Sequence, residues 1–324
     1  MYAKMLINPA LLSANTRRKA PWVERRCNLN EHEFTACYLR PRRPVVLTDA
    51  LREWQALRVF TPNFFRQRFA NVPVQSGAGE ITLGEAIDQQ LASTRENPGA
   101  QSCVLADCTE LLPYLSPRFA CSLPSRHGHR LLPRAVFEML NPLHVVFGAS
   151  GNAFSDLHCS ALHTHGWIAQ VHGETEILLY EPDQEHLLYI DPARPSSSLV
   201  RDAADLAAYP LLREARCRRI VLRPGDALFV PSGIWYAQRR ASLSISVEFD
   251  QIESSNWNAF ADAVFAAQLR SGRDLRALAY GVWLRLLGPV LRAAEWLGAD
   301  RAFDWGCNAS TGLKAARRCS AHRN

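Results

Sequence analysis

The sequence predicts a mainly β protein: a sandwich or barrel core with an α/β region before it and helices after it. Between residues 141 and 252, short apolar runs alternate with turn-forming residues, which is typical of sandwiches and barrels. The segment 242–247 alternates strictly between polar and apolar residues, as a half-buried strand does. After Asn256, apolar residues recur three and four apart, which indicates amphipathic helices.

The composition is that of an ordinary globular protein. The chain has 324 residues, of which 48% are hydrophobic, enough for one large domain or two small ones. No apolar run reaches the roughly 20 residues that span a bilayer, and the first residues do not have the order of a secretory signal. The nine cysteines contain no CxxC pair, which indicates free thiols in a reducing compartment. We therefore expect a cytoplasmic protein.

The chain divides into five expected segments. They are a basic N-terminal arm (1–27), an α/β region (28–140), the strand-rich core (141–252), a helical region (253–310) and a basic tail (311–324). The net charge is +6 and several arginine clusters occur, but no nucleic-acid motif accompanies them, so nucleic acid is not an expected partner. Part of the apolar face of the C-terminal helices is expected to contact a partner, with a homodimer as one form.

The elements expected in chain order follow from local patterns. In the α/β region, we expect helices from Asn30, over 63–69 and up to about 93, strands over 44–48 and 72–75, and loops over 94–101 and 122–130. In the core, we expect strands over 145–148, 167–171, 177–180, 220–222, 227–230 and 243–249.

The most specific motif is the stretch 223–235, RPGDALFVPSGIW. Pro224-Gly225-Asp226 predicts a tight turn, and a buried apolar strand follows it. A second turn at 231–233 then directs the next side chains into the mouth of the barrel.

With the segments 43–54, 155–160 and 167–173, this motif resembles the JmjC/cupin-8 oxygenases over roughly residues 35 to 255. The resemblance implies a double-stranded β-helix (cupin or jelly-roll) core. It also implies Fe(II), held by a His-x-Asp pair and a distal His, and 2-oxoglutarate, held by a Lys shortly after a Gly.

Most of these positions carry other residues here. By the resemblance, His158 matches the first metal ligand, Ser160 replaces the Asp and Tyr236 replaces the distal His. A neutral hydroxyl is a poor ligand for a divalent cation, and a phenol with its usual pKa near 10 must first lose a proton. Thr175 stands at the position of the Lys, and no Lys occurs between residues 20 and 313.

Other residues could rebuild the site. Arg239 or Arg240 could bind a carboxylate in place of the Lys, since strand parity turns one of the two inward, and we expect Ser155, Thr175 and Arg239 to line an organic-acid pocket. His163 and His165, two apart, would share one face of a strand and could join His158 in a three-histidine metal site.

Three functions remain open from the sequence. In the first, the chain is an atypical metal-dependent hydroxylase or oxygenase of a small molecule or peptide, with His158 and Tyr236 among its catalytic residues. Alternatively, it is an inactive binding or interaction protein that keeps the barrel. In the third alternative, His158 and Tyr236 act as acid and base without a metal.

Overall fold

The computed structural model describes the residues 22–76, 79–94, 102–106, 109–115, 144–150, 154–160, 162–190, 196–197, 207–270 and 274–297. The expected connection 122–130, the basic tail 311–324 and most of the expected loop 94–101 lie outside these residues. So do most of the N-terminal arm and the end of the helical region. Residues 24–26 of that arm form a strand of the larger sheet.

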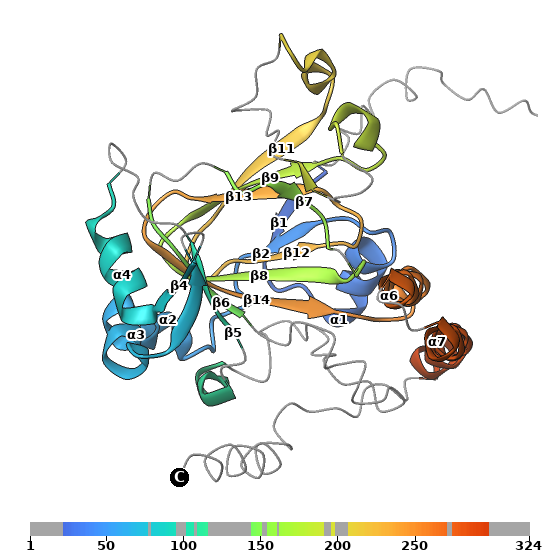
Figure 1. Cartoon of the computed structure of the whole chain (residues 1–324), viewed down its shortest axis with the longest axis horizontal. Coiled ribbons are helices and arrows are strands. Elements are labelled where there is room, and N and C mark those ends of the chain that lie inside the picture. The colour runs from blue at the N-terminus through green and yellow to red at the C-terminus, as the bar shows by residue number, and fades with distance from the viewer. Residues whose placement is uncertain are drawn as a thin grey trace, which may run out of the picture.

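Two β-sheets form the core, as the fold prediction states (Figure 1). The larger sheet contains, in spatial order, Glu24–Arg26 (β1), Val45–Leu47 (β2), Ala227–Val230 (β12), His165–His172 (β8), Ser244–Gln251 (β14), His144–Gly148 (β6), Cys103–Ala106 (β5), Pro73–Ser76 (β3) and Gly79–Thr82 (β4). The smaller sheet contains Ser196–Ser197 (β10), Leu157–His158 (β7), Tyr236–Arg240 (β13), Thr175–Tyr180 (β9) and Cys217–Leu222 (β11).

The two faces of the larger sheet have different environments. In β14, Ile245 and Val247 pack into the largest apolar cluster, together with side chains from the N-terminal helices. The alternate residues Ser246 and Glu248 face the other way, where they hydrogen-bond Arg240 of the smaller sheet. The space between the sheets is therefore polar around Arg240 and apolar where Ile168 and Leu228 meet residues of β9 and β11.

Short N-terminal helices cover the outer face of the larger sheet (Figure 1). They are Glu31–Phe34 (α1), Ala56–Val59 (α2), Pro62–Phe69 (α3) and Leu83–Ala92 (α4), with a π-helical turn at Thr35–Leu39. Thr61 caps α3, and Thr82 forms a reciprocal capping box with Glu85 at the start of α4. These caps fix the helix starts, so the apolar side chains of α3 and α4 reach the sheet.

Two longer helices, Trp257–Arg270 (α6) and Asp274–Trp296 (α7), follow the barrel and pack against each other. The indole N–H of Trp257 donates a hydrogen bond of 2.7 Å to the carbonyl oxygen of Leu284. In the described residues, no helix has the length and apolar character that crossing a bilayer requires. On the opposite face of α7, Val282, Leu286 and Val290 recur four apart and are 47%, 68% and 46% exposed.

The expected homodimer through these helices stays a prediction. We expect the protein to sediment as a dimer, and Leu286→Asp to convert it to a monomer with an unchanged melting temperature, because a charge there would be buried on association. Analytical ultracentrifugation checks this, with Leu211→Asp, an exposed leucine far along the chain, as the control. A monomeric unmodified protein would contradict the expectation.

Candidate functional site

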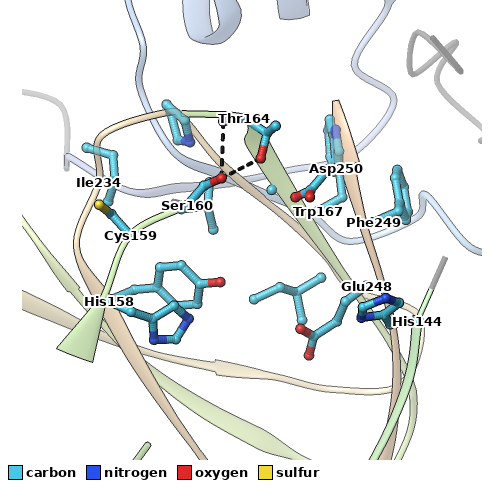
Figure 2. Close-up of a pocket in the computed structure, with 15 residues that line it drawn as sticks. His144, His158, Cys159, Ser160, Thr164, Trp167, Ile234, Glu248, Phe249 and Asp250 are labelled. Carbon is cyan, nitrogen blue, oxygen red and sulfur yellow. Dashed lines mark hydrogen bonds between the residues drawn. The ribbon is translucent and has the colours of Figure 1, made fainter. Parts of the chain in front are cut away.

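A cavity of about 330 Å³ opens between the two sheets (Figure 2). It is bordered by strands of both sheets and by the turns that join them. The lining residues are His144, His158, Cys159, Ser160, Thr164, Gly166, Trp167, Ile168, Val230, Pro231, Ile234, Tyr236, Glu248, Phe249 and Asp250. The three positions that the resemblance assigns to metal ligands, 158, 160 and 236, therefore reach one cavity.

His158 and Tyr236 lie opposite each other on paired strands. β7 pairs with β13 at these two residues, and their ring centroids are 4.4 Å apart. The Nδ1 atom of His158 is 2.8 Å from the carbonyl oxygen of Asp156. Because a carbonyl oxygen only accepts, Nδ1 carries a proton, and in the neutral ring the lone pair is therefore on Nε2. Among the described residues no hydrogen bond to Nε2 is formed, so this atom can serve a ligand.

Ser160 is engaged in a local turn. Its hydroxyl lies 2.5 Å from Oγ1 of Thr164 and accepts a hydrogen bond of 3.1 Å from the Thr164 backbone N–H (Figure 2). The backbone N–H of His163 donates to the Ser160 carbonyl oxygen. The side chain therefore holds the 160–164 turn in shape, and it adds no negative charge to the cavity.

Tyr236 keeps its proton. Burial raises the pKa of its phenol well above the usual range, and the carboxylates of Glu248 and Asp250 raise it further, while Arg240 acts in the opposite direction. A neutral phenol is a weak ligand for Fe(II) but a good hydrogen-bond donor. In the part of the chain that the structure describes, its hydroxyl has no hydrogen-bond partner.

The predicted three-histidine site is wrong. His165 is fully buried and lies outside the cavity: its Nδ1 accepts a hydrogen bond of 2.9 Å from the Ser232 backbone N–H, and its Nε2 is 3.1 Å from Glu253. Both ring nitrogens are thus occupied. His163 lies before β8 with a left-handed backbone (φ 52°), so the two histidines do not share a strand face.

The His165–Glu253 contact also affects the carboxylate. Burial alone would raise the pKa of Glu253, but the hydrogen bonds from His165 and Ser255 outweigh it and lower the pKa. The buried pair fastens β8 to the segment before α6, which gives His165 a structural role.

None of the three predicted organic-acid residues lines the cavity. Ser155 exchanges hydrogen bonds of 2.8 and 3.1 Å with the backbone of Gln238 and extends the strand pairing. Arg239 points outward, where its Nε is 2.6 Å from Glu176 and its guanidinium lies over the Phe154 ring. Neither residue lines the cavity.

Arg240, not Arg239, is the arginine that faces inward. It is 3% exposed, and its Nη1 donates hydrogen bonds of 2.8 Å to Thr175 and 3.3 Å to Ser246. Its Nη2 is 3.4 Å from Glu248. Burial lowers the pKa of Arg240, and Glu248 opposes this effect. Thr175, which we expected to line an organic-acid pocket, does not line the cavity, and its hydroxyl accepts a hydrogen bond from Arg240.

Glu248 and Asp250 are site residues that the sequence reasoning missed. Both lie on β14 and line the cavity on the side away from His158 (Figure 2). A signal was available, because the alternation of 242–247, extended to residue 250, puts 248 and 250 on the same face as Ser246. The polar face of a half-buried strand usually faces solvent, whereas here it borders the cavity.

The donor set does not fit the metal that the resemblance implies. In the described residues, no three His, Cys, Asp or Glu side chains come close enough together to hold a metal ion. Of the three expected ligands, only His158 offers a suitable free atom. The set does not fit 2-oxoglutarate either, because the inward arginine is already paired with Glu248.

Gly148 supplies the space for Arg240. A Cβ atom at this position would lie 2.4 Å from Cγ of Arg240 and 3.0 Å from Oγ of Ser102. We expect Gly148→Ala to lower the free energy of unfolding by about 1–3 kcal/mol, as overpacked cores do, measured by urea denaturation. Gly166→Ala is the matched control, because its Cβ would meet only Val230 at 3.9 Å. Equal losses in both variants would contradict the steric argument.

Comparison with known proteins gives a family match. Residues 31–249 match the model of a family described as the cupin-like domain. The chain is 26% identical over 235 residues to lysine-specific demethylase 8 of Danio rerio, covering 67% of this chain and 55% of that protein. It is 33% identical over 238 residues to Jumonji C domain-containing protein 5 of Drosophila melanogaster, covering 67% and 56%. Over 69 residues, 21% of each chain, it is 38% identical to tRNA wybutosine-synthesizing protein 5 of Danio rerio. The chain spans little more than half the length of the first two relatives.

Proposed function

This chain belongs to the cupin-like domain family and to its JmjC oxygenase lineage, and on that premise we propose that it is a binding protein of this lineage. In this proposal, the barrel cavity binds a small molecule or a peptide side chain without Fe(II) and 2-oxoglutarate chemistry. The name of one relative states a demethylase activity, and we do not propose that activity for this chain.

One observation supports this proposal above all others: the three expected ligand positions converge, yet they offer one free donor atom. The usual non-haem Fe(II) face consists of two histidines and a carboxylate. Here Nε2 of His158 shares the cavity with a serine hydroxyl bound to Thr164 and a phenol that keeps its proton. The three positions share one cavity, but two of them lack a side chain suited to Fe(II).

The cavity fits a small ligand that carries hydrogen-bond donors. Its volume of about 330 Å³ lies at the lower end of the range for small-molecule sites, roughly 300–1,000 Å³. Trp167, Ile234 and the Tyr236 ring provide apolar surface, and Glu248 and Asp250 provide carboxylates. The cytoplasm remains the proposed location, and the described cysteines are free thiols, which is compatible with it.

The His158–Tyr236 contact favours a second candidate, a metal-free acid–base catalyst. With its proton on Nδ1, His158 presents the basic Nε2 atom, and the adjacent phenol is a neutral proton donor. Turnover of a bound ligand by the metal-free protein, lost in Tyr236→Phe, would establish this candidate. The atypical oxygenase remains the third hypothesis, and the amount of metal bound per chain distinguishes it from the other two.

We expect the protein purified without chelators to carry a substoichiometric amount of transition metal after dialysis against Fe(II) under anaerobic conditions, because His158 alone is a weak site. The doubly substituted protein, Ser160→Asp with Tyr236→His, restores the full ligand set and should bind close to one Fe(II) per chain. Elemental analysis by mass spectrometry gives both values.

His158→Ala added to the doubly substituted protein is the control, and it should remove the gained metal. A stoichiometric metal in the unmodified protein, lost in His158→Ala, would overturn the proposal in favour of the atypical oxygenase. A doubly substituted protein that folds but binds no metal would show that the three positions are not a ligand set.

A further inference from the structure

We propose that Glu248 closes an internal carboxylate-binding site built around Arg240, and that it thereby excludes carboxylate ligands from the cavity. The inference deepens the proposed function and rests on it, since it states which class of ligand that cavity rejects. It is carried by the juxtaposition of a buried arginine, two hydroxyls and a carboxylate at the cavity wall.

The residues around Arg240 have the composition of an anion site. A guanidinium binds carboxylates through paired N–H donors, and hydroxyl groups commonly complete such sites. Arg240 is buried between Thr175 and Ser246, to which its Nη1 donates hydrogen bonds of 2.8 and 3.3 Å. Gly148 lacks the side chain that would occupy the space of the arginine.

Glu248 already occupies the place of the anion. Its Oε1 is 3.4 Å from Nη2 of Arg240 and accepts a hydrogen bond of 3.0 Å from the Ser246 hydroxyl. The same side chain lines the cavity. A ligand that enters the cavity therefore meets the carboxylate of Glu248 before it can reach the guanidinium.

Charge and hydrogen bonding both disfavour a second carboxylate. Asp250 lies two positions further along the same strand and also lines the cavity, so an incoming anion meets a second carboxylate beside Glu248. Among the described residues, the buried atoms Ser244 Oγ, Gln170 Oε1 and Gln238 Oε1 on neighbouring strands have no hydrogen-bond partner. The two amide oxygens can only accept, as a carboxylate does, so they offer no hydrogen bond to a carboxylate ligand.

The outward arginine of the same strand shows a different arrangement. Arg239 and Arg219 both contact Glu176 at the edge of the smaller sheet, and they are 33% and 47% exposed. The two arginines are thus partly open to water, and none of these three residues lines the cavity. The Arg240–Glu248 pair differs from them, because it is buried and its carboxylate is on the cavity wall, where it can control ligand entry.

The experiment measures binding of three carboxylates, 2-oxoglutarate, N-oxalylglycine and succinate, to metal-free protein in EDTA, by thermal shift and calorimetry. The unmodified protein should show no shift beyond that of sodium chloride at equal ionic strength. Glu248→Ala should melt at a lower temperature, because it leaves a buried charge unpaired, and carboxylates near saturation should raise its melting temperature by about 2 °C or more.

Two control variants assign the effect. Glu214→Ala removes an exposed glutamate and should behave as the unmodified protein. Adding Arg240→Met to Glu248→Ala should abolish the gained shift, because the site then lacks its cation. If Glu248→Ala does not fold, Glu248→Gln, which keeps the shape of the side chain, replaces it.

Stabilisation of the unmodified protein by any of the three carboxylates overturns the inference. A cooperatively folded Glu248→Ala or Glu248→Gln variant that binds none of the three carboxylates also overturns it. These readings are taken without metal, so they are independent of the Fe(II) content that tests the proposed function. An unmodified protein that binds stoichiometric Fe(II), but binds no carboxylate when it is metal-free, would contradict the proposed function. The same result would still support the inference about Arg240 and Glu248.

Discussion

The register of β13 is the constraint on which the rest of the site depends. This strand pairs with β7 on one side and β9 on the other, which places Tyr236 opposite His158 and Arg240 opposite Thr175. Because side chains alternate along a strand, a slip by one residue would turn Arg239 inward and Tyr236 outward. The cavity, the buried ion pair and the apolar wall all follow from this one alignment.

A buried guanidinium is costly unless charge and hydrogen bonds compensate it. Three neighbours of Arg240, namely Thr175, Ser246 and Glu248, provide that compensation from two strands of different sheets. The pair therefore has two consequences at once: it fastens the sheets together at the polar end of the barrel, and it sets the electrostatics of the adjacent cavity. Stability and ligand selection are thus coupled through the same atoms.

The fold was predictable from the sequence because it depends on periodicity and turns. Alternation in β14, the turn at 224–226 and the helical spacing after Asn256 are all local signals, and each corresponds to an observed element. The meeting of positions 158, 160 and 236 was predictable only through the resemblance, because it joins segments far apart in the chain. Strand starts are poorly fixed by sequence, so parity could not decide between Arg239 and Arg240.

The other site residues depend on facts that no local pattern contains. The positive φ angle of His163 breaks the two-residue period that would have aligned it with His165. The partner of His165, Glu253, comes from a segment 88 residues away, so its structural role is visible only in three dimensions. Glu248 and Asp250 were missed because polar residues on alternate positions usually face water, whereas here they face an enclosed space.

The close approach of Arg240 to Gly148 links two positions that are 92 residues apart in the chain. The residues at these two positions depend on each other. A side chain at 148 would exclude the long inward arginine, and a small residue at 240 would leave a void beside the glycine. A side chain at 148 and an inward arginine at 240 therefore exclude each other. A glycine and an arginine that covary at these two positions would therefore mark other chains with the same interior.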